Sequence, residues 1–203
     1  MGVGATFLTS KEFNKSEIID VLKNSIKSVP NNEIMFLEKI IEDFENNDFS
    51  LITPQQIVFL ENNPKSKWTE YLIFRYKFQN FPKKHIDSEF PTHLLIEPVS
   101  ACNIRCIMCF QVDETFSKNS EFMGTMDFEL FKKVIDDAYD LGIQAITFSG
   151  RGEPTLNPKF GDMLEYCKGK FFDLKVNTNA TKLNEKLIHK IIQSGVTDLV
   201  FSI

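Results

Sequence analysis

The sequence predicts an α/β fold: a partial parallel (β/α) barrel, with the first four strands present, preceded by an all-helical N-terminal domain. Two observations predict this. Apolar residues recur at helical spacing up to about residue 80, and beyond residue 92 short apolar runs alternate with helical stretches. Strand–helix alternation with short connections indicates parallel strands joined by right-handed crossovers. The chain has 203 residues, enough for a helical domain and a separate α/β core.

The N-terminal domain, residues 1–80, is expected to hold four helices. Helical apolar spacing marks three of them, at residues 18–29, 34–44 and 66–78. For the helix between the last two, Thr53 suits the N-cap, Pro54 suits the first helical position and Gln56 completes a capping box. The prolines and charges of residues 81–91 indicate a linker.

The barrel part, residues 92–203, is expected to alternate four strands with three helices. The strands are predicted at 93–99, 143–148, 171–178 and 196–203, and the helices at 127–141, 157–169 and 184–195. Asp127 suits a helix N-cap, with Met126 and Phe131 placed for a hydrophobic staple. Four strands cannot close a barrel and no helix follows the last one. We therefore expect the chain to be a truncated fragment whose remaining half lies beyond Ile203.

Composition and charge are those of an ordinary globular protein. The chain is 42% apolar and 25% charged, and its net charge of −5 argues against nucleic-acid binding. No apolar run is long enough to span a bilayer, and the four cysteines lack the paired spacing of a secreted disulfide framework. We therefore expect a cytoplasmic protein with no membrane partner. The first six residues match the N-myristoylation pattern, but a disordered start explains so short a match more simply.

Three cysteines within eight residues, Cys102, Cys106 and Cys109, are the strongest chemical feature. Three thiolates so close together can converge on one metal centre. A structural zinc site and an electron-transfer iron–sulfur cluster each take four ligands, so three ligands leave one metal position open for chemistry. The alternative is a zinc site completed by a distant histidine or by Cys167. We expect Cys167 instead to be a small buried residue of a helix.

Polar segments lie at the carboxyl ends of all four predicted strands of the barrel part. In order they are the cysteine segment, Ser149-Gly150-Arg151-Gly152-Glu153-Pro154, Asn177-Thr178-Asn179 and Ser202. The carboxyl ends of parallel strands share one edge of the sheet, where ligands of such folds bind. We therefore expect the four segments to build one site.

These motifs together resemble those of the radical S-adenosylmethionine (radical SAM) enzymes. The cysteines match the family signature Cys-x-x-x-Cys-x-x-Cys after a first strand. Gly-Arg-Gly-Glu-Pro resembles the family's Gly-Gly-Glu-Pro motif, Asn177-Thr178-Asn179 its Thr-Asn-Gly segment, and Leu-Val-Phe-Ser-Ile the start of its Ser-Ile-Asp segment. The resemblance covers residues 93–203. The cysteine triad and Gly-Glu-Pro on successive strands are together highly specific.

The resemblance implies two cofactors. The three cysteines would hold a 4Fe–4S cluster whose open iron takes S-adenosylmethionine, and an electron from the reduced cluster would cleave the sulfonium. The resulting 5′-deoxyadenosyl radical would abstract hydrogen from a substrate. Glu153 would accept hydrogen bonds from the ammonium group of S-adenosylmethionine. The other residues expected at this cofactor are Gly150, Gly152, Asn179, Ser202 and Met108, with Met108 near the adenine.

Several residues leave alternatives open. Arg151 replaces the first glycine of Gly-Gly-Glu-Pro, and its guanidinium either pairs with a carboxylate or faces solvent. Ala180 replaces the glycine of Thr-Asn-Gly, so we expect no left-handed backbone there. Glu97 either points into the barrel toward cofactor or substrate or marks a wet strand end. Simpler roles are a solvated loop carboxylate for Glu153, turn chemistry for Asn177 and Asn179, and structural or exposed positions for His85, His93 and His189.

The resemblance gives the substrate and partners only in outline. The strand-end segments look most like members that carry a further SPASM-type cluster domain after the barrel, which favours a peptide or protein substrate over a sugar or a nucleotide. A flavodoxin or a ferredoxin would act as reductant. The helical N-terminal domain is a candidate docking module for a substrate or partner. The competing hypotheses are an iron–sulfur electron carrier or redox sensor, and an inactive barrel fragment that acts as a binding module.

Overall fold

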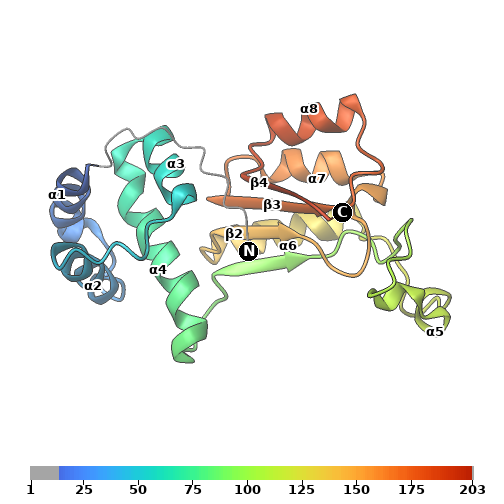
Figure 1. The fold of residues 1–203 in the computed structure, drawn as a ribbon, viewed down its shortest axis with the longest axis horizontal. Helices are drawn as coiled ribbons and strands as arrows, with labels where there is room; N and C mark the ends of the chain where they lie inside the picture. Colours follow the sequence, from blue (N-terminus) through green and yellow to red (C-terminus); the bar gives the residue numbers. More distant parts are fainter. Residues whose placement is uncertain (1–13, 203) are drawn as a thin grey trace. The chain divides into compact units, whose positions relative to one another are not determined.

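The computed structural model describes residues 14–202, so the opening six residues with the myristoylation-like pattern lie outside the described residues. The chain divides into two compact units, Met1–Asp87 and Ser88–Ile203. This division falls inside the segment predicted as a linker. Figure 1 shows the helices of the first unit and the sheet of the second, and each unit buries apolar side chains of its own.

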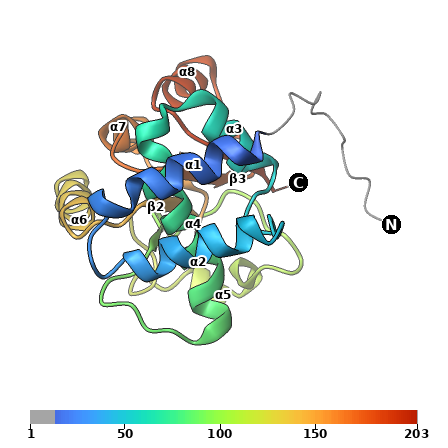
Figure 2. The same ribbon diagram turned by 90° about the vertical axis from the view of Figure 1, so that its left-hand side faces the viewer.

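The described residues of the first unit, the helical unit, form four α-helices. These are α1 (Lys15–Ser25), α2 (Ile34–Glu45), α3 (Pro54–Asn62) and α4 (Trp68–Lys84). Figure 2 shows α1, α2 and α4 packed beside one another. Leu22, Leu37 and Leu72, one from each of these helices, are fully buried. Thr53 and Gln56 form the predicted capping box at the start of α3. All four predicted helices are therefore present.

The last helix of this unit is longer than predicted, because α4 continues past residue 78 to Lys84 and includes Pro82. Proline lacks an N–H and removes one backbone hydrogen bond, but here the loss falls in the last turn. Phe81 is buried, with its ring 5.4 Å from that of Phe36, which favours continuation of the helix. Residues 81–84 of the predicted linker are thus helical, and the helix ends at the left-handed His85.

The second unit contains a four-stranded parallel sheet with the strands in sequence order. The strands are β1 (His93–Ile96), β2 (Ala145–Phe148), β3 (Asp173–Thr178) and β4 (Asp198–Phe201). Leu94 is paired in register with Ile146, Ile146 with Leu174, and Val176 with Leu199. This topology confirms the predicted α/β class with parallel strands. The observed strands are shorter than predicted: β1 ends three residues earlier, β2 and β3 each begin two residues later, and β4 is shorter at both ends.

One face of the sheet packs on three helices, α6 (Phe128–Asp140), α7 (Phe160–Cys167) and α8 (Glu185–Gln193), which Figure 1 shows outside the strands. Ile146, Phe148 and Val176 are fully buried against these helices. Asp127 caps α6 as predicted, since its carboxylate accepts the N–H groups of Glu129 and Leu130. Cys167 lies in this core, and burial raises the pKa of its thiol to about 12. It is therefore a small buried residue, as expected.

The helix predicted to open at Asn157 begins three residues later, at Phe160. Asn157 is 3% exposed, and its side-chain amide donates to the carbonyl of Pro98 at 2.9 Å. This contact holds the segment after the short 3₁₀ turn Pro154–Leu156 against the end of β1, so Asn157 serves a loop rather than a helix start. No helix among residues 14–202 is both long enough and apolar enough to cross a bilayer.

Candidate functional site

The four segments predicted to form one site are hydrogen-bonded to one another at the carboxyl edge of the sheet. The loop after β2 is tied to the cysteine segment through the N–H of Glu153, which donates to the carbonyl of Ala101 at 2.9 Å. The segment after β3 joins the same loop through the N–H of Asn179, 2.7 Å from Glu153 Oε2. Ser202 N–H donates to the carbonyl of Thr178. The predicted convergence is therefore observed.

Glu153 is the centre of this network and is only 3% exposed. Its Oε1 accepts the hydroxyls of Thr178 and Thr155, both at 2.6 Å, and the N–H of Thr155 at 3.1 Å. Its Oε2 accepts the N–H of Asn179, which leaves lone-pair capacity on that oxygen. The alternative of a solvated loop carboxylate is thus wrong. The carboxylate is fixed in position by groups from two adjacent strand ends.

Gly152 is required by close packing of two backbones. A Cβ on this residue would lie 2.0 Å from the carbonyl oxygen of Val99 and 2.6 Å from that of Ala101. Gly150 has a φ of +144°, which side chains other than glycine rarely adopt, and a Cβ there would meet the carboxylate of Glu97. Both glycines therefore act through the backbone, by letting the Glu153 loop lie directly on the start of the cysteine segment.

The cysteine segment is more exposed than the Glu153 loop. Cys106 is exposed, Cys102 and Cys109 are half-buried, and all three are free thiols. The side-chain amide of Asn179 donates to Cys102 Sγ at 3.8 Å, and the N–H of Gln111 donates to Cys109 Sγ at 3.5 Å. Among residues 14–202, no three His, Cys, Asp or Glu side chains are arranged to hold a metal ion. The role of the three cysteines as shared ligands therefore stays a prediction.

Gln111 is a site residue that the sequence did not reveal. It is fully buried, and its side-chain amide donates to the carbonyl of Ser100 at 2.6 Å and to that of Arg151 at 2.8 Å. It thereby joins the end of the cysteine segment to its start and to the loop after β2. No local pattern marks it, because both carbonyls come from residues distant in sequence.

The remaining predicted cofactor residues differ in how firmly they are held. Asn179 Nδ2 donates to Asn103 Oδ1 at 3.0 Å as well as to Cys102 Sγ, so Asn179 links the segment after β3 to the cysteine segment. Ser202 is exposed, and Met108 is 85% exposed. Their proposed contacts with a cofactor stay predictions.

Ala180 corrects one sequence expectation. Its φ is +62°, so the backbone at this position is left-handed although the residue is not glycine. A non-glycine residue in this conformation costs roughly 1–2 kcal/mol. The cost is offset locally, because the N–H of Ala180 donates to the hydroxyl of Thr178 at 3.0 Å. The left-handed backbone at this position is therefore supported by hydrogen bonding rather than by residue type. Asn177 also does not form a turn, since it lies in β3 and donates to Ser149 Oγ.

The open alternative for Arg151 is decided in favour of pairing with a carboxylate, that of Glu97. Arg151 Nη2 and Nε donate to Glu97 Oε1 at 2.8 and 3.1 Å. Burial alone would raise the pKa of Glu97, but the hydrogen bonds and charge of Arg151 outweigh it and lower that pKa. Glu97 is therefore an ionised partner of Arg151 at the end of β1.

None of the three histidines lies among the site residues. His93 Nε2 is 3.0 Å from Thr147 Oγ1, on the neighbouring strand, and burial with the nearby charge of Lys175 lowers the pKa of this imidazole. His85 ends α4, and His189 is exposed on α8. The expectation of structural or exposed positions is confirmed for all three.

Comparison with known proteins identifies the family. The profile of the Radical SAM superfamily matches residues 96–203, more than half of the chain, and the chain belongs to this superfamily. The tungsten-containing aldehyde ferredoxin oxidoreductase cofactor-modifying protein of Pyrococcus furiosus is 38% identical over 110 residues, which are 54% of this chain and 29% of the relative. The antilisterial bacteriocin subtilosin biosynthesis protein AlbA of Bacillus subtilis is 30% identical over 47% of this chain and 20% of its own length.

Among solved structures, that of BtrN in complex with AdoMet and 2-DOIA aligns with a TM-score of 0.49 and 20% identity, over 57% of this chain and 46% of that one. The chain spans less than a third of the length of the two relatives compared above.

The cofactors of this superfamily are a 4Fe–4S cluster and S-adenosylmethionine. The donor set fits the cluster in its chemistry, since three free cysteines lie in one segment and cysteine sulfur is the usual ligand of such clusters. Glu153 fits the second cofactor, because a fixed carboxylate with a free lone pair suits an ammonium group.

Proposed function

We propose that this protein catalyses reductive cleavage of S-adenosylmethionine and hydrogen abstraction from a peptide or protein substrate. Cys102, Cys106 and Cys109 would hold the cluster, which supplies the electron for cleavage. The observation that carries the proposal is the position of Glu153. Its buried carboxylate is bonded to Asn179, whose side chain also contacts the sulfur of Cys102.

In this proposal the residues of the chain bind and orient the cofactors. Glu153 accepts the ammonium group, while the hydroxyls of Thr155 and Thr178 keep its carboxylate from rotating. Asn179 sets the distance between this carboxylate and Cys102. Gly150, Gly152, Ser202 and Met108 complete the proposed cofactor surface, with Met108 available to pack against a purine.

An electron carrier or redox sensor is the competing function. It would use the cluster alone and has no need of a buried carboxylate held by four hydrogen bonds beside the cysteines. The arrangement around Glu153 therefore favours the enzyme. Because the chain spans less than a third of the relatives compared above, substrate turnover requires a test on the longest available form of the protein.

The decisive experiment is anaerobic reconstitution with iron and sulfide, followed by reduction, addition of S-adenosylmethionine and assay of 5′-deoxyadenosine. We expect product from the native protein and none from Cys106→Ala. Cys167→Ala is the matched control, since this buried thiol should be dispensable for iron binding. Full cluster content without 5′-deoxyadenosine would overturn the enzyme and leave the electron carrier.

The proposed substrate class is inferred from the names of two relatives and from the motif resemblance. One relative is named for bacteriocin biosynthesis, which agrees with a peptide substrate, and another is named for modification of a cofactor. Together with the motif resemblance this favours a peptide or protein over a sugar or a nucleotide. A flavodoxin or ferredoxin would donate the electron. A reducing cytoplasmic location belongs to the same proposal, because all four cysteines are free thiols.

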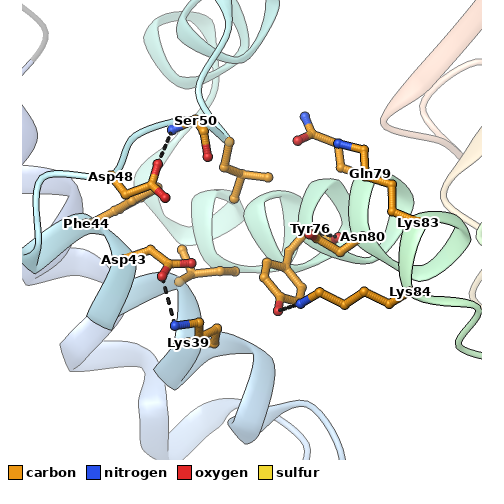
Figure 3. Close-up of a pocket in the computed structure, with 12 residues that line it drawn as sticks. Lys39, Asp43, Phe44, Asp48, Ser50, Tyr76, Gln79, Asn80, Lys83 and Lys84 are labelled. Carbon is orange, nitrogen blue, oxygen red and sulfur yellow. Dashed lines mark hydrogen bonds and ion pairs between the residues drawn. The ribbon is translucent and has the colours of Figure 1, made fainter.

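The helical unit is proposed to dock the substrate or a partner, and a cavity of about 200 Å³ supports this role (Figure 3). The cavity lies between α2, the turn after it and the C-terminal half of α4. Its carboxylates are already engaged, Asp43 by Lys39 and Asp48 by the N–H of Ser50. Lys84 donates to the neutral hydroxyl of Tyr76 at 3.3 Å, and the lining contains three lysines against two carboxylates. The cavity therefore offers positive charge to an acidic segment.

A labelled heptaglutamate peptide is the probe for this docking role, with heptaglutamine as the uncharged comparison. We expect the double variant Lys83→Glu, Lys84→Glu to weaken glutamate-peptide binding about tenfold in fluorescence anisotropy. Lys186→Glu on α8 is the control and should have no effect. Equal binding of both peptides by the native protein would rule out charge recognition at this cavity.

A further inference from the structure

The site has two halves, the cysteine segment and the loop that carries Glu153. Arg151 and Glu97 form a link between them. Beyond the two side-chain bonds given above, Arg151 Nε also approaches Glu97 Oε2 at 3.1 Å, and the backbone N–H of Arg151 donates to the same oxygen at 2.5 Å. One carboxylate thus binds both the guanidinium and the backbone of the same residue. It also lies against Gly150, where a Cβ would be 2.6 Å from Oε2. Glu97 therefore fixes the first residues of the loop that carries Glu153.

The guanidinium of Arg151 also contacts Phe116, which lies beyond Cys109 in the sequence. Its Cζ lies 5.3 Å from the centroid of the Phe116 ring, a cation–π distance. Phe116 meets the edge of Phe110, with ring centroids 5.1 Å apart, and Phe110 directly follows Cys109. Phe116 is also stacked on Phe122 at 5.6 Å. The side chain of Arg151 is therefore in contact with the end of β1 and with the aromatic cluster that follows the cysteines in the sequence.

We propose that Glu97, Arg151 and Phe116 form a positioning clamp that sets the spacing between the cysteine segment and Glu153 for S-adenosylmethionine. This inference rests on the proposed function. A ligand that bridges two loops binds best when their spacing is fixed before it arrives. Glu153 is fixed to β3 by its own hydrogen bonds, whereas the cysteines are exposed or half-buried. The clamp extends the rigidity of the Glu153 loop to the cysteine side.

The clamp also explains why an arginine stands at position 151, where the family motif has a glycine. A glycine at position 151 would provide the turn but neither the guanidinium contact to Phe116 nor the paired bonds to Glu97. Since Arg151 donates both Nε and Nη2 to Glu97, its role is to orient the loop rather than to contact the cofactor. Glu97 and Arg151 are thus positioning residues that act through each other.

A double-mutant cycle on the reconstituted protein tests the clamp. Glu97→Gln removes the charge at constant shape, and Arg151→Met keeps the stem while removing the guanidinium. We expect each single variant to raise the dissociation constant for S-adenosylmethionine about tenfold, and the double variant to raise it no further. Iron content should stay at the native level. Asp136→Asn on α6, which weakens the 2.8 Å pair with Lys170 in the turn after α7, is the control and should leave affinity unchanged.

Two results would overturn the clamp. Native affinity in Glu97→Gln would show that the pairing is irrelevant, and loss of affinity in Arg151→Met alone would assign the guanidinium directly to the cofactor. A readout without cofactor separates this question from the proposed function. In the metal-free protein, hydrogen exchange of residues 99–122 should quicken equally in both single variants. Failure of the native protein to form 5′-deoxyadenosine would instead refute the enzymatic proposal and leave the exchange result standing.

Discussion

The two halves of the site are held in opposite ways. The loop after β2 is buried at Glu153, packs its backbone directly on that of the cysteine segment at Gly152, and takes hydrogen bonds from the segment after β3. In the cysteine segment, by contrast, Cys106 is exposed and Cys102 is only half-buried. Glu153 is thus held in position without any ligand. In the proposed function, the cysteine segment would be organised further when the cluster binds.

The largest effect is expected where the two backbones touch. In Gly152→Ala the new methyl group would overlap the carbonyl oxygens of Val99 and Ala101, and movement of the Ala101 carbonyl would disturb its bond from Glu153 N–H. We expect a loss of about 3 kcal/mol in the free energy of unfolding, measured with urea. Gly124→Ala is the matched control, because a Cβ there meets nothing within 4 Å. Similar losses in both variants would refute the close-packing argument.

The next effect tests the hydrogen bonds of Glu153. Glu153→Gln keeps the shape but directs an NH₂ group at one of the donors that now face the carboxylate. A buried donor left without an acceptor should lower the free energy of unfolding by about 2 kcal/mol. Urea unfolding of the metal-free protein measures it, with exposed Glu129→Gln as the comparison. An unchanged stability would mean that the carboxylate is not a structural centre.

A smaller gain is expected at Ala180, where the backbone is left-handed. Glycine tolerates this conformation without steric cost, so Ala180→Gly should stabilise the metal-free protein by about 1 kcal/mol. Thermal unfolding provides the measurement. A destabilised variant would indicate that the methyl group makes packing contacts worth more than the strain.

The pairing of Glu97 predicts a pH effect that is weaker still. Since Arg151 lowers the pKa of this carboxylate in the folded state, the contribution of the pair is present above the unfolded value and is lost as pH falls through the folded one. The stability difference between native protein and Glu97→Gln should therefore be constant above roughly pH 5 and shrink toward roughly pH 3. A difference that grows on acidification would contradict an ionised Glu97.

The smallest effect on stability is expected in the cysteine segment. Cys106 is exposed, so Cys106→Ala should change the unfolding free energy of the metal-free protein by less than about 0.5 kcal/mol, while iron content after reconstitution falls sharply. Chemical unfolding and iron analysis on the same sample give both values. A large loss of stability in metal-free Cys106→Ala would contradict the difference between the Glu153 loop and the cysteine segment.

Local signals in the sequence predicted most of the fold. The capping box at Thr53, the cap at Asp127 and the strand–helix alternation depend on neighbouring residues and were confirmed. The convergence of the strand ends followed from topology. The partners of Glu153, Arg151 and Gln111 were missed because they are set by contacts between distant segments. Glu97 and Arg151, for example, are 54 residues apart, and no local pattern of residues in the sequence indicates such a pair.

The strand order of the sheet has a consequence for how the chain acquires its structure during synthesis. β1, β2, β3 and β4 pair strictly in the order in which a ribosome would deliver them. Each of β2, β3 and β4 can therefore pair with the strand synthesised just before it, and no strand has to stay unpaired until a much later strand is made. We expect the sheet to grow by addition at one edge, with the cysteine segment already emerged when the Glu153 loop arrives to pack against it.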